Sequence, residues 1–430
     1  MMSISPRRIW KRSNQSLPLS LALVVALALV AASCGSSLDS AANDDSAAPS
    51  SAEPAGTVEA LPVEESDPAP STTTSAAPAT TTTTTSTTTT TTTIATTTTT
   101  TAIDCAALLP LEHRIGQLMF PVMVQDEFAI AADLARDGLL GGVVVLGAPD
   151  VSIANDIRAY QEASLFGDGI IAVDEEGGRV QRLTSLTSAL PSAGTVAETL
   201  TLDEAAQLAQ EHAIAIGELG FTMNLAPVVD LNNGTFIGDR SFGADPGEVT
   251  DYAFATADGI IAAGLDPVVK HFPGHGRGID SHTGLPTIPG VETLQGSDLI
   301  PFVEAVDRGD LPIMIGHLIV EDLTDGLPAS VSPAAVDGLL RTDIGFDGLV
   351  MTDALNMDAI STTLNNAEAA ELSLAAGVDL IMLGSIADTE LTVERIVEAV
   401  ADGRITEQSI NESVIRVMDT RGIGVCDLAS

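Results

Sequence analysis

The sequence predicts an α/β protein whose globular part is a (β/α)8 barrel of the TIM type, preceded by a signal peptide and a disordered, threonine-rich stalk. Three observations support this prediction. The composition changes sharply near residue 104, short apolar runs alternate with helical stretches after that point, and ionisable residues follow the ends of the apolar runs. The predicted segments are residues 1–33 (signal peptide), 34–103 (linker) and 104–430 (barrel).

The first 34 residues have the features of an export signal. The segment opens with four basic residues: Arg7, Arg8, Lys11 and Arg12. The apolar run at 19–30 is too short to span a bilayer, and small residues lead from it to Cys34. Residues 31–34 (AASC) resemble a lipoprotein box, although many such boxes have leucine where this chain has Ala31. We expect an exported protein that is lipid-anchored through Cys34 to the outer face of the cell membrane, or secreted if Cys34 is not lipidated.

Residues 35–101 consist almost entirely of Ser, Thr, Ala, Pro and acidic residues, so they cannot bury a core and are predicted to form a disordered stalk. The formal net charge of the chain is −41, which makes nucleic acid and anionic membrane surfaces poor partners. Lysine occurs only at Lys11 and Lys270. Because the other strong cations are all arginines, we expect a specific role for Lys270.

Two cysteines, Cys105 and Cys426, lie at the two ends of the predicted barrel domain. In an oxidising compartment they could form a disulfide, and a closed barrel brings its first and last elements together. We therefore expect an intramolecular disulfide, with two unpaired buried cysteines as the alternative.

The apolar runs predict eight strands, near residues 115–122, 142–146, 169–174, 222–229, 266–271, 312–317, 348–353 and 378–383. Helices with an apolar stripe are expected at 205–218, 249–263, 367–376 and 390–401. A closed barrel is favoured, and a doubly wound open sheet is the alternative.

Ionisable residues lie at the carboxyl ends of five predicted strands: Asp174, Asp230, Lys270 with His271, His317, and Asp353. A single aspartate in such a place often caps the next helix. Five strands with this pattern instead predict an active site at the carboxyl-terminal rim of the barrel, where barrel enzymes carry their catalytic residues.

The segment 270–286, KHFPGHGRGIDSHTGLP, leaves its strand as a loop. His271 and His275 have the spacing of zinc ligands on a helix, but Pro273 and the neighbouring glycine prevent a helix there. We therefore expect no metal and no cofactor. Within this loop, Asp280 can accept a ring proton from His282, which makes His282 a candidate proton donor and acceptor near neutral pH.

Two further strings carry candidate residues. Asp353, in the string MTDALNM at 351–357, stands at the barrel mouth, where a carboxylate can attack an anomeric carbon or stabilise a cationic transition state. In DEEGGRVQR at 174–182, the paired glycines allow the backbone to approach a ligand, and Asp174 and Arg182 can bind sugar hydroxyls.

Together these strings resemble the family-3 glycoside hydrolases, in particular the bacterial β-N-acetylglucosaminidase branch of cell-wall recycling. The resemblance covers residues 111–424. Its most specific parts are KHFPGHG (270–276), DSH (280–282), IGDRSFG (237–243) and FDGLVMTDALNM (346–357).

The resemblance implies a retaining exo-hydrolase for terminal β-N-acetylglucosamine on peptidoglycan fragments or chitooligosaccharides. Asp353 would be the nucleophile, and His282, oriented by Asp280, the general acid/base. Residues that match sugar-binding positions of the family are Asp174, Arg182, Arg240, Lys270 and His271, and His317 is expected to line the pocket. His275 is expected to brace the loop.

The chain departs from the family pattern in two respects. It has Glu175 where the family commonly has His or Gln, which would alter substrate preference or point outward. Larger members of the glucosidase branch take their acid from a further domain, whereas this sequence ends soon after the barrel, so we expect His282 to supply the acid. The alternatives are a phosphorylase of the same family and a catalytically dead, glycan-binding surface lipoprotein.

Overall fold

The computed structural model describes residues 105–309 and 311–428. The predicted signal peptide (1–33), the linker up to residue 103 and the lipid-attachment residue Cys34 lie outside the described residues. Within the described part of the chain, no helix is both long and apolar enough to cross a membrane.

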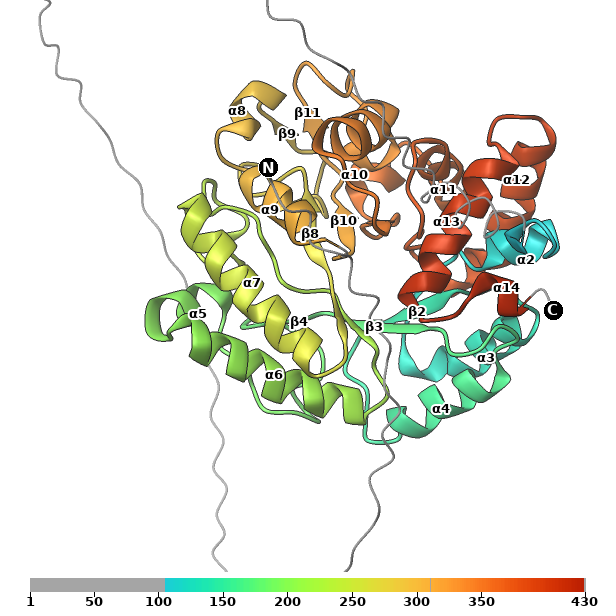
Figure 1. The fold of residues 1–430 in the computed structure, drawn as a ribbon, viewed down its shortest axis with the longest axis horizontal. Helices are drawn as coiled ribbons and strands as arrows, with labels where there is room; N and C mark the ends of the chain where they lie inside the picture. Colours follow the sequence, from blue (N-terminus) through green and yellow to red (C-terminus); the bar gives the residue numbers. More distant parts are fainter. Residues whose placement is uncertain (1–104, 310, 429–430) are drawn as a thin grey trace, which may run out of the picture. The chain divides into compact units, whose positions relative to one another are not determined.

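Parallel strands form the centre of the domain (Figure 1). They are β1 (Val122–Met123), β2 (Gly142–Val145), β3 (Ile170–Val173), β6 (Met223–Asn224), β7 (Asp266–Pro267), β8 (Val269–Phe272), β10 (Ile313–Ile315) and β12 (Val350–Thr352). One sheet has the order β1-β2-β3-β6-β7 and another the order β12-β10-β8. All β2 and β3 residues are buried, as expected for strands that are covered on both faces.

Single bridges close these two sheets into a ring. Val228 bridges Lys270 and so connects the end of the β6 segment to β8. On the opposite side, Leu380 bridges Met351, and Ile381 bridges Met119. Because β7 and β8 are separated by a single residue and occupy one position of the ring, the segment around 380–381 is the eighth strand position. The predicted (β/α)8 barrel is confirmed, and the open doubly wound sheet is wrong.

Helices lie around the outside of the strands (Figure 1). The longer ones are α3 (Phe128–Arg136), α4 (Ile153–Ala163), α6 (Leu202–Glu218), α7 (Pro246–Ala262), α9 (Ile300–Arg308), the π-helix η4 (Ala334–Ile344), α11 (Asn366–Ala375), α12 (Thr389–Ala401) and α13 (Glu407–Thr420). Shorter ones are α2 (Leu111–Gly116), α5 (Ala193–Thr199), α8 (Val291–Gln295), α10 (Asp358–Ser361) and α14 (Val425–Leu428).

The four predicted helices are confirmed as α6, α7, α11 and α12, and each starts slightly earlier than expected. The reason is that a polar cap precedes the apolar stripe. Thr201 and Glu204 form a reciprocal capping box at the start of α6. Asp245 caps α7, whose first residue is Pro246.

The first predicted strand, 115–122, is partly wrong, because residues 115 and 116 belong to α2. Leu111, Ile115 and Leu118 are three or four residues apart, which is the spacing of one helix face. The chain becomes extended only afterwards, with the bridge at Met119 and then β1.

The two ends of the domain are joined covalently. Cys105 and Cys426 form a disulfide with a Cα–Cα distance of 4.9 Å, although they are 321 residues apart in sequence. Buried arginines add polar contacts between the same regions: Arg114 donates to Asn411 at 2.6 Å, and Arg421 donates to Gln117 at 2.6 Å. The expected disulfide is confirmed, and the alternative of two unpaired cysteines is wrong.

Candidate active site

A pocket of about 350 Å³ opens at the carboxyl ends of the barrel strands. It is lined by seven of the residues expected from the sequence: Asp174, Arg182, Arg240, Lys270, His271, His282 and Asp353. The barrel therefore brings together side chains from segments that are up to 179 positions apart, counted from 174 to 353. Apolar side chains from the strands, among them Val144 and Met314, also line it.

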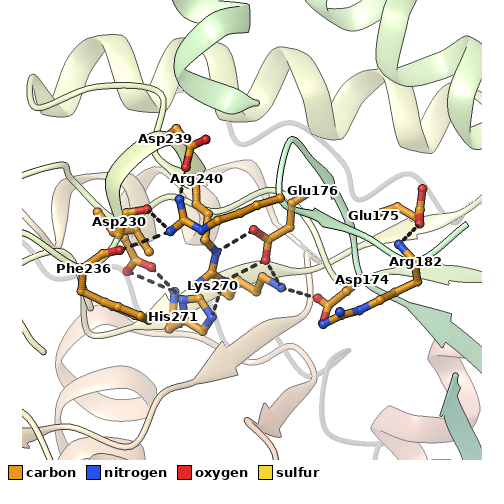
Figure 2. A network of polar contacts seen from close by, with 12 residues as sticks. Asp174, Glu175, Glu176, Arg182, Asp230, Phe236, Asp239, Arg240, Lys270 and His271 are labelled. Atoms are coloured by element: carbon orange, nitrogen blue, oxygen red, sulfur yellow. Dashed lines mark hydrogen bonds and ion pairs between the residues drawn. The ribbon is translucent and has the colours of Figure 1, made fainter. Parts of the chain in front are cut away.

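Lys270 lies at the centre of a charged network (Figure 2). Its Nζ is 2.6 Å from Asp174 Oδ1 and 2.7 Å from Glu176 Oε1. Glu176 also accepts hydrogen bonds from Arg240 Nε at 2.8 Å and Nη2 at 2.9 Å. Arg182 Nη2 is 3.8 Å from Asp174 Oδ2. Asp174 and Arg182 are the more exposed members of the network, and their free edges are available to sugar hydroxyls.

The network holds fixed charges at neutral pH. Burial alone would raise the pKa of Glu176, but Lys270 and Arg240 outweigh burial and lower it to about 2. Burial also opposes the charge of Lys270, yet Asp174 and Glu176 raise its pKa above the ordinary value. These groups therefore suit binding and orientation of a substrate, and proton transfer must come from elsewhere in the pocket.

Lys270 and His271 are adjacent in sequence, and both line the pocket. In a regular strand, consecutive side chains point to opposite faces. Here the pairing of β8 with β10 shifts, because Met314 opposes Lys270 whereas Ile315 opposes Phe272. His271 is the extra residue of this irregularity, which is a common way to redirect a side chain beside an active site.

Asp230 orients the ring of His271. Its Oδ2 is 2.7 Å from His271 Nδ1, and its Oδ1 accepts the His271 backbone N–H at 3.2 Å. Burial alone would raise the pKa of Asp230, but His271 and then His275 lower it. An ionised carboxylate at Nδ1 favours the tautomer with a proton there. The other ring nitrogen, Nε2, lies 3.5 Å from Arg240 Nη2.

Asp353 directly follows β12. Its backbone N–H donates to the Ile315 carbonyl at 2.9 Å, and its Oδ1 accepts the Ala354 N–H at 2.8 Å. Burial alone would raise the pKa of Asp353, but the nearby His271 and then His317 outweigh it and lower the pKa below the ordinary value. The side chain is thus a carboxylate at neutral pH, which is the state that a nucleophile requires.

His317 does not line the pocket, contrary to the expectation from the sequence. It is fully buried, with Nδ1 at 2.8 Å from Ser330 Oγ and Nε2 at 3.0 Å from the Ala354 carbonyl. Burial lowers its pKa despite the nearby carboxylate of Asp353. Because every ring nitrogen already has a partner, the geometry fits support of the 353–354 backbone better than contact with a sugar.

His282 and Asp280 form the expected pair on the loop after β8. His282 Nδ1 and the His282 backbone nitrogen both lie 2.9 Å from Asp280 Oδ1. Burial acts to raise the pKa of Asp280, but the hydrogen bonds from His282 lower it. Asp280 lies behind His282 and is not a lining residue of the pocket. The pair is fixed through Nδ1, so Nε2 is the nitrogen available for proton exchange.

Glu175 does not line the substrate pocket, and it is buried, so the expectation that it points outward is wrong, whereas an effect on substrate preference stays a prediction. It begins β4 (Glu175–Gly177), which pairs with β5 (Val180–Gln181) as an antiparallel hairpin. Its Oε1 accepts the backbone N–H groups of Arg182 at 2.6 Å and Leu183 at 2.7 Å. Its Oε2 is 2.7 Å from Nε2 of buried His212.

Two residues of the site were missed as site residues. Glu176 belongs to the string at 174–182, in which only Asp174 and Arg182 were predicted to bind substrate, and Asp230 was predicted only to follow a strand. The available signals were strand alternation, which places the side chains of Glu175 and Glu176 on opposite faces, and the position of Asp230 one residue beyond a predicted strand.

Among the described residues, no group of three or more His, Cys, Asp or Glu side chains is arranged to hold a metal ion. The expectation of no metal and no cofactor remains a prediction.

Comparisons with known proteins place this geometry in a family. Residues 110–420 match the Glycosyl hydrolase family 3 N terminal domain. Beta-hexosaminidase LpqI of Mycobacterium tuberculosis is 40% identical over 331 residues, which cover 74% of this chain and 84% of that protein. Beta-hexosaminidase of Tolumonas auensis is 34% identical over 280 residues, which cover 62% of this chain and 82% of that protein.

The solved structures agree with the sequence relatives. A β-N-acetylglucosaminidase of glycoside hydrolase family 3 from Paenibacillus sp. has a TM-score of 0.69 and 31% identity, and the match covers 75% of this chain and 64% of that one. The matched family domain spans the whole barrel. It includes β8, which leads into the loop with His275 and His282, and β12, which Asp353 follows. The chain is a glycoside hydrolase and belongs to glycosyl hydrolase family 3.

Proposed function

We propose that this protein is a retaining exo-glycosidase that removes terminal β-linked N-acetylglucosamine from peptidoglycan fragments or chitooligosaccharides. The observation that carries the proposal is the pocket itself. It presents an ionised Asp353, the His282–Asp280 pair and a network of fixed charges around Lys270 to one substrate. Relatives named beta-hexosaminidase and β-N-acetylglucosaminidase support the choice of sugar.

In the first chemical step, a carboxylate oxygen of Asp353 attacks the anomeric carbon, and the bond from that carbon to the glycosidic oxygen breaks. The protonated ring of His282 gives its Nε2 proton to the departing oxygen. In the second step, neutral His282 takes a proton from water, whose oxygen displaces Asp353 from the anomeric carbon. Two displacements retain the β configuration, and Asp280 stabilises the imidazolium form of His282.

The test is turnover of aryl β-N-acetylglucosaminide and aryl β-glucoside by the purified protein, with and without phosphate and with and without a chelator. We expect hydrolysis of the N-acetyl substrate, without a requirement for phosphate and without inhibition by the chelator. A sugar 1-phosphate product would identify a phosphorylase. Absence of turnover on every substrate would favour the glycan-binding alternative.

The role of Asp353 is tested by covalent trapping. A slow fluorinated N-acetylglucosaminide should leave a sugar on the peptide that contains Asp353, and Asp353→Ala should abolish turnover and trapping together. A sugar found on another side chain would overturn the assignment of the nucleophile.

We also propose that the mature chain is exported and held at the outer face of the cell membrane through Cys34, with residues 35–103 as a spacer. A polymeric wall substrate lies outside the membrane, and the AASC sequence supports lipid attachment. Metabolic labelling with a fatty acid should mark the wild type and leave Cys34→Ala unlabelled. A label that persists in Cys34→Ala would contradict the anchor.

A further inference from the structure

We propose that the hydrogen bond between Ser281 and His275 positions His282 for proton transfer, so that Ser281 and His275 are positioning residues of the reaction. This inference rests on the proposed function, in which His282 is the general acid/base. The position of His282 is determined by Ser281, which lies between Asp280 and His282, and by His275, which does not touch the reacting atoms of the substrate.

Ser281 is the fixed point of an otherwise exposed segment. Its residue exposure is 1%, whereas the side chains of Asp280 and His282 on either side are 39% and 66% exposed. Ser281 Oγ lies 3.0 Å from His275 Nε2. The Ser281 carbonyl also accepts the Ala359 N–H at 3.1 Å, which connects the loop to α10.

The neighbours of Ser281 lack such connections. In the described part of the chain, the hydrogen bonds of Asp280, His282 and Thr283 run within the loop itself: His282 donates to Asp280, and Thr283 donates to the Asp280 carbonyl at 3.0 Å. The Asp280–His282 pair sets the tautomer of the ring, but it cannot set where the pair lies above the pocket. That position depends on Ser281.

His275 is held firmly enough to act as the anchor. It is 1% exposed, and its backbone N–H donates to Asp230 Oδ1 at 2.6 Å. Its ring packs against Phe236 and His271, with centroid distances of 4.9 and 5.8 Å. Burial, followed by the nearby His271, lowers the pKa of His275 and favours the neutral ring.

The same Asp230 that anchors His275 also orients the pocket residue His271. A single buried carboxylate thus fixes a residue that lines the sugar pocket and, through His275 and Ser281, the loop that carries the proton donor. Two hydrogen bonds thus hold the loop that carries His282. One joins Ser281 Oγ to His275 Nε2, and the other runs from the Ala359 N–H to the Ser281 carbonyl.

The experiment compares kcat/KM for two aryl β-N-acetylglucosaminides, one with a leaving group of low pKa (2,4-dinitrophenol) and one with a leaving group of high pKa (phenol). Departure of the first needs little protonation, whereas departure of the second depends on the acid. Ser281→Ala should lower kcat/KM roughly tenfold for the phenyl substrate, because one hydrogen bond that fixes the acid is lost, and less than about twofold for the dinitrophenyl substrate.

The controls separate this proposal from the proposed function. His282→Ala should lower kcat/KM for the phenyl substrate more than Ser281→Ala does, and should affect the dinitrophenyl substrate less. If His282→Ala shows no such selectivity, His282 is not the acid, and the proposed function fails together with the positioning role. Thr283→Ala removes a hydroxyl from the same loop without cutting the connection to the barrel, and should match the wild type.

A double-mutant cycle tests whether the pair acts through one bond. His275→Asn and Ser281→Ala should each lower kcat/KM for the phenyl substrate, and the double variant should lose little more than the stronger single variant. If Ser281→Ala left both substrates unaffected, or slowed both to the same extent while His282→Ala was selective, the positioning role would be overturned.

Discussion

At the scale of single residues, Lys270 shows how one buried cation organises the site. Its Nζ contacts Asp174 and Glu176, and its side chain is only 3% exposed. Removal of one partner from such a network leaves uncompensated charge inside the protein, which costs far more than the loss of a surface ion pair. The rarity of lysine in this sequence predicted a specific role, and the contacts supply a physical reason for it.

We therefore expect Lys270→Met to lower both stability and substrate binding. The free energy of unfolding should fall by about 3–5 kcal/mol, as for other broken buried pairs. KM should rise because Asp174 is no longer held in place for the sugar. Urea unfolding and steady-state kinetics measure the two effects. Arg136→Met, which removes a cation from an exposed ion pair with Asp133, is the matched control and should change stability by less than about 1 kcal/mol.

Glu176 predicts a pH dependence of stability. Its pKa lies near 2 in the folded protein, below its ordinary value of 4.5. Its ionised form therefore stabilises the fold above about pH 4.5, and this contribution is lost as the pH falls towards 2. The difference in unfolding free energy between wild type and Glu176→Gln should be largest at pH 6–7 and shrink between about pH 5 and 3. A difference that stayed constant over this range would contradict the lowered pKa.

At the scale of elements, the β4–β5 hairpin explains both a wrong expectation and a missed residue. Strand alternation sends Glu175 towards α6 and Glu176 towards the pocket. The sequence has two adjacent glutamates here, and alternation predicts that they point to opposite faces but not which of them faces the pocket. Only the tertiary partners, His212 on one side and Lys270 on the other, assign their roles.

Glu175 should consequently affect binding through the backbone of Arg182. Glu175→Ala leaves the backbone N–H groups of Arg182 and Leu183, and buried His212, without their carboxylate partner, at a cost of about 1–3 kcal/mol for a buried group. We expect a lower unfolding temperature and a raised KM, with a smaller change in kcat. Glu211→Ala, on the surface of α6, should leave both quantities unchanged. A normal KM in a clearly destabilised Glu175→Ala would show that the hairpin holds without this anchor.

Sequence periodicity identified the barrel strands and four helices, because buried parallel strands are continuous apolar runs. It did not identify the bulge in β8, the support role of His317 or the link from Ser281 to His275. These depend on pairing register and on contacts between segments that are distant in sequence or bent back by a loop. The residue types of the site were predictable from position at strand ends, whereas the partner of each residue was not.

At the scale of the whole molecule, the disulfide between Cys105 and Cys426 closes almost the entire barrel domain into one covalent ring. Such a bond stabilises a fold chiefly by restricting the unfolded chain, on the order of 2–4 kcal/mol. The same ends are also joined by Arg114 and Arg421, which contact α13 and the segment after α2. Neither cysteine lines the pocket.

The double variant Cys105→Ala/Cys426→Ala should therefore unfold at a lower temperature than the wild type and keep its kcat and KM at 25 °C. Reduction of the wild type should produce the same shift in unfolding temperature, and reduction of the variant should produce none. Quantification of free thiols should find both cysteines unreactive before reduction. If kcat fell together with the unfolding temperature, the bond would be needed for the geometry of the rim, and its effect could not be assigned to the unfolded chain alone.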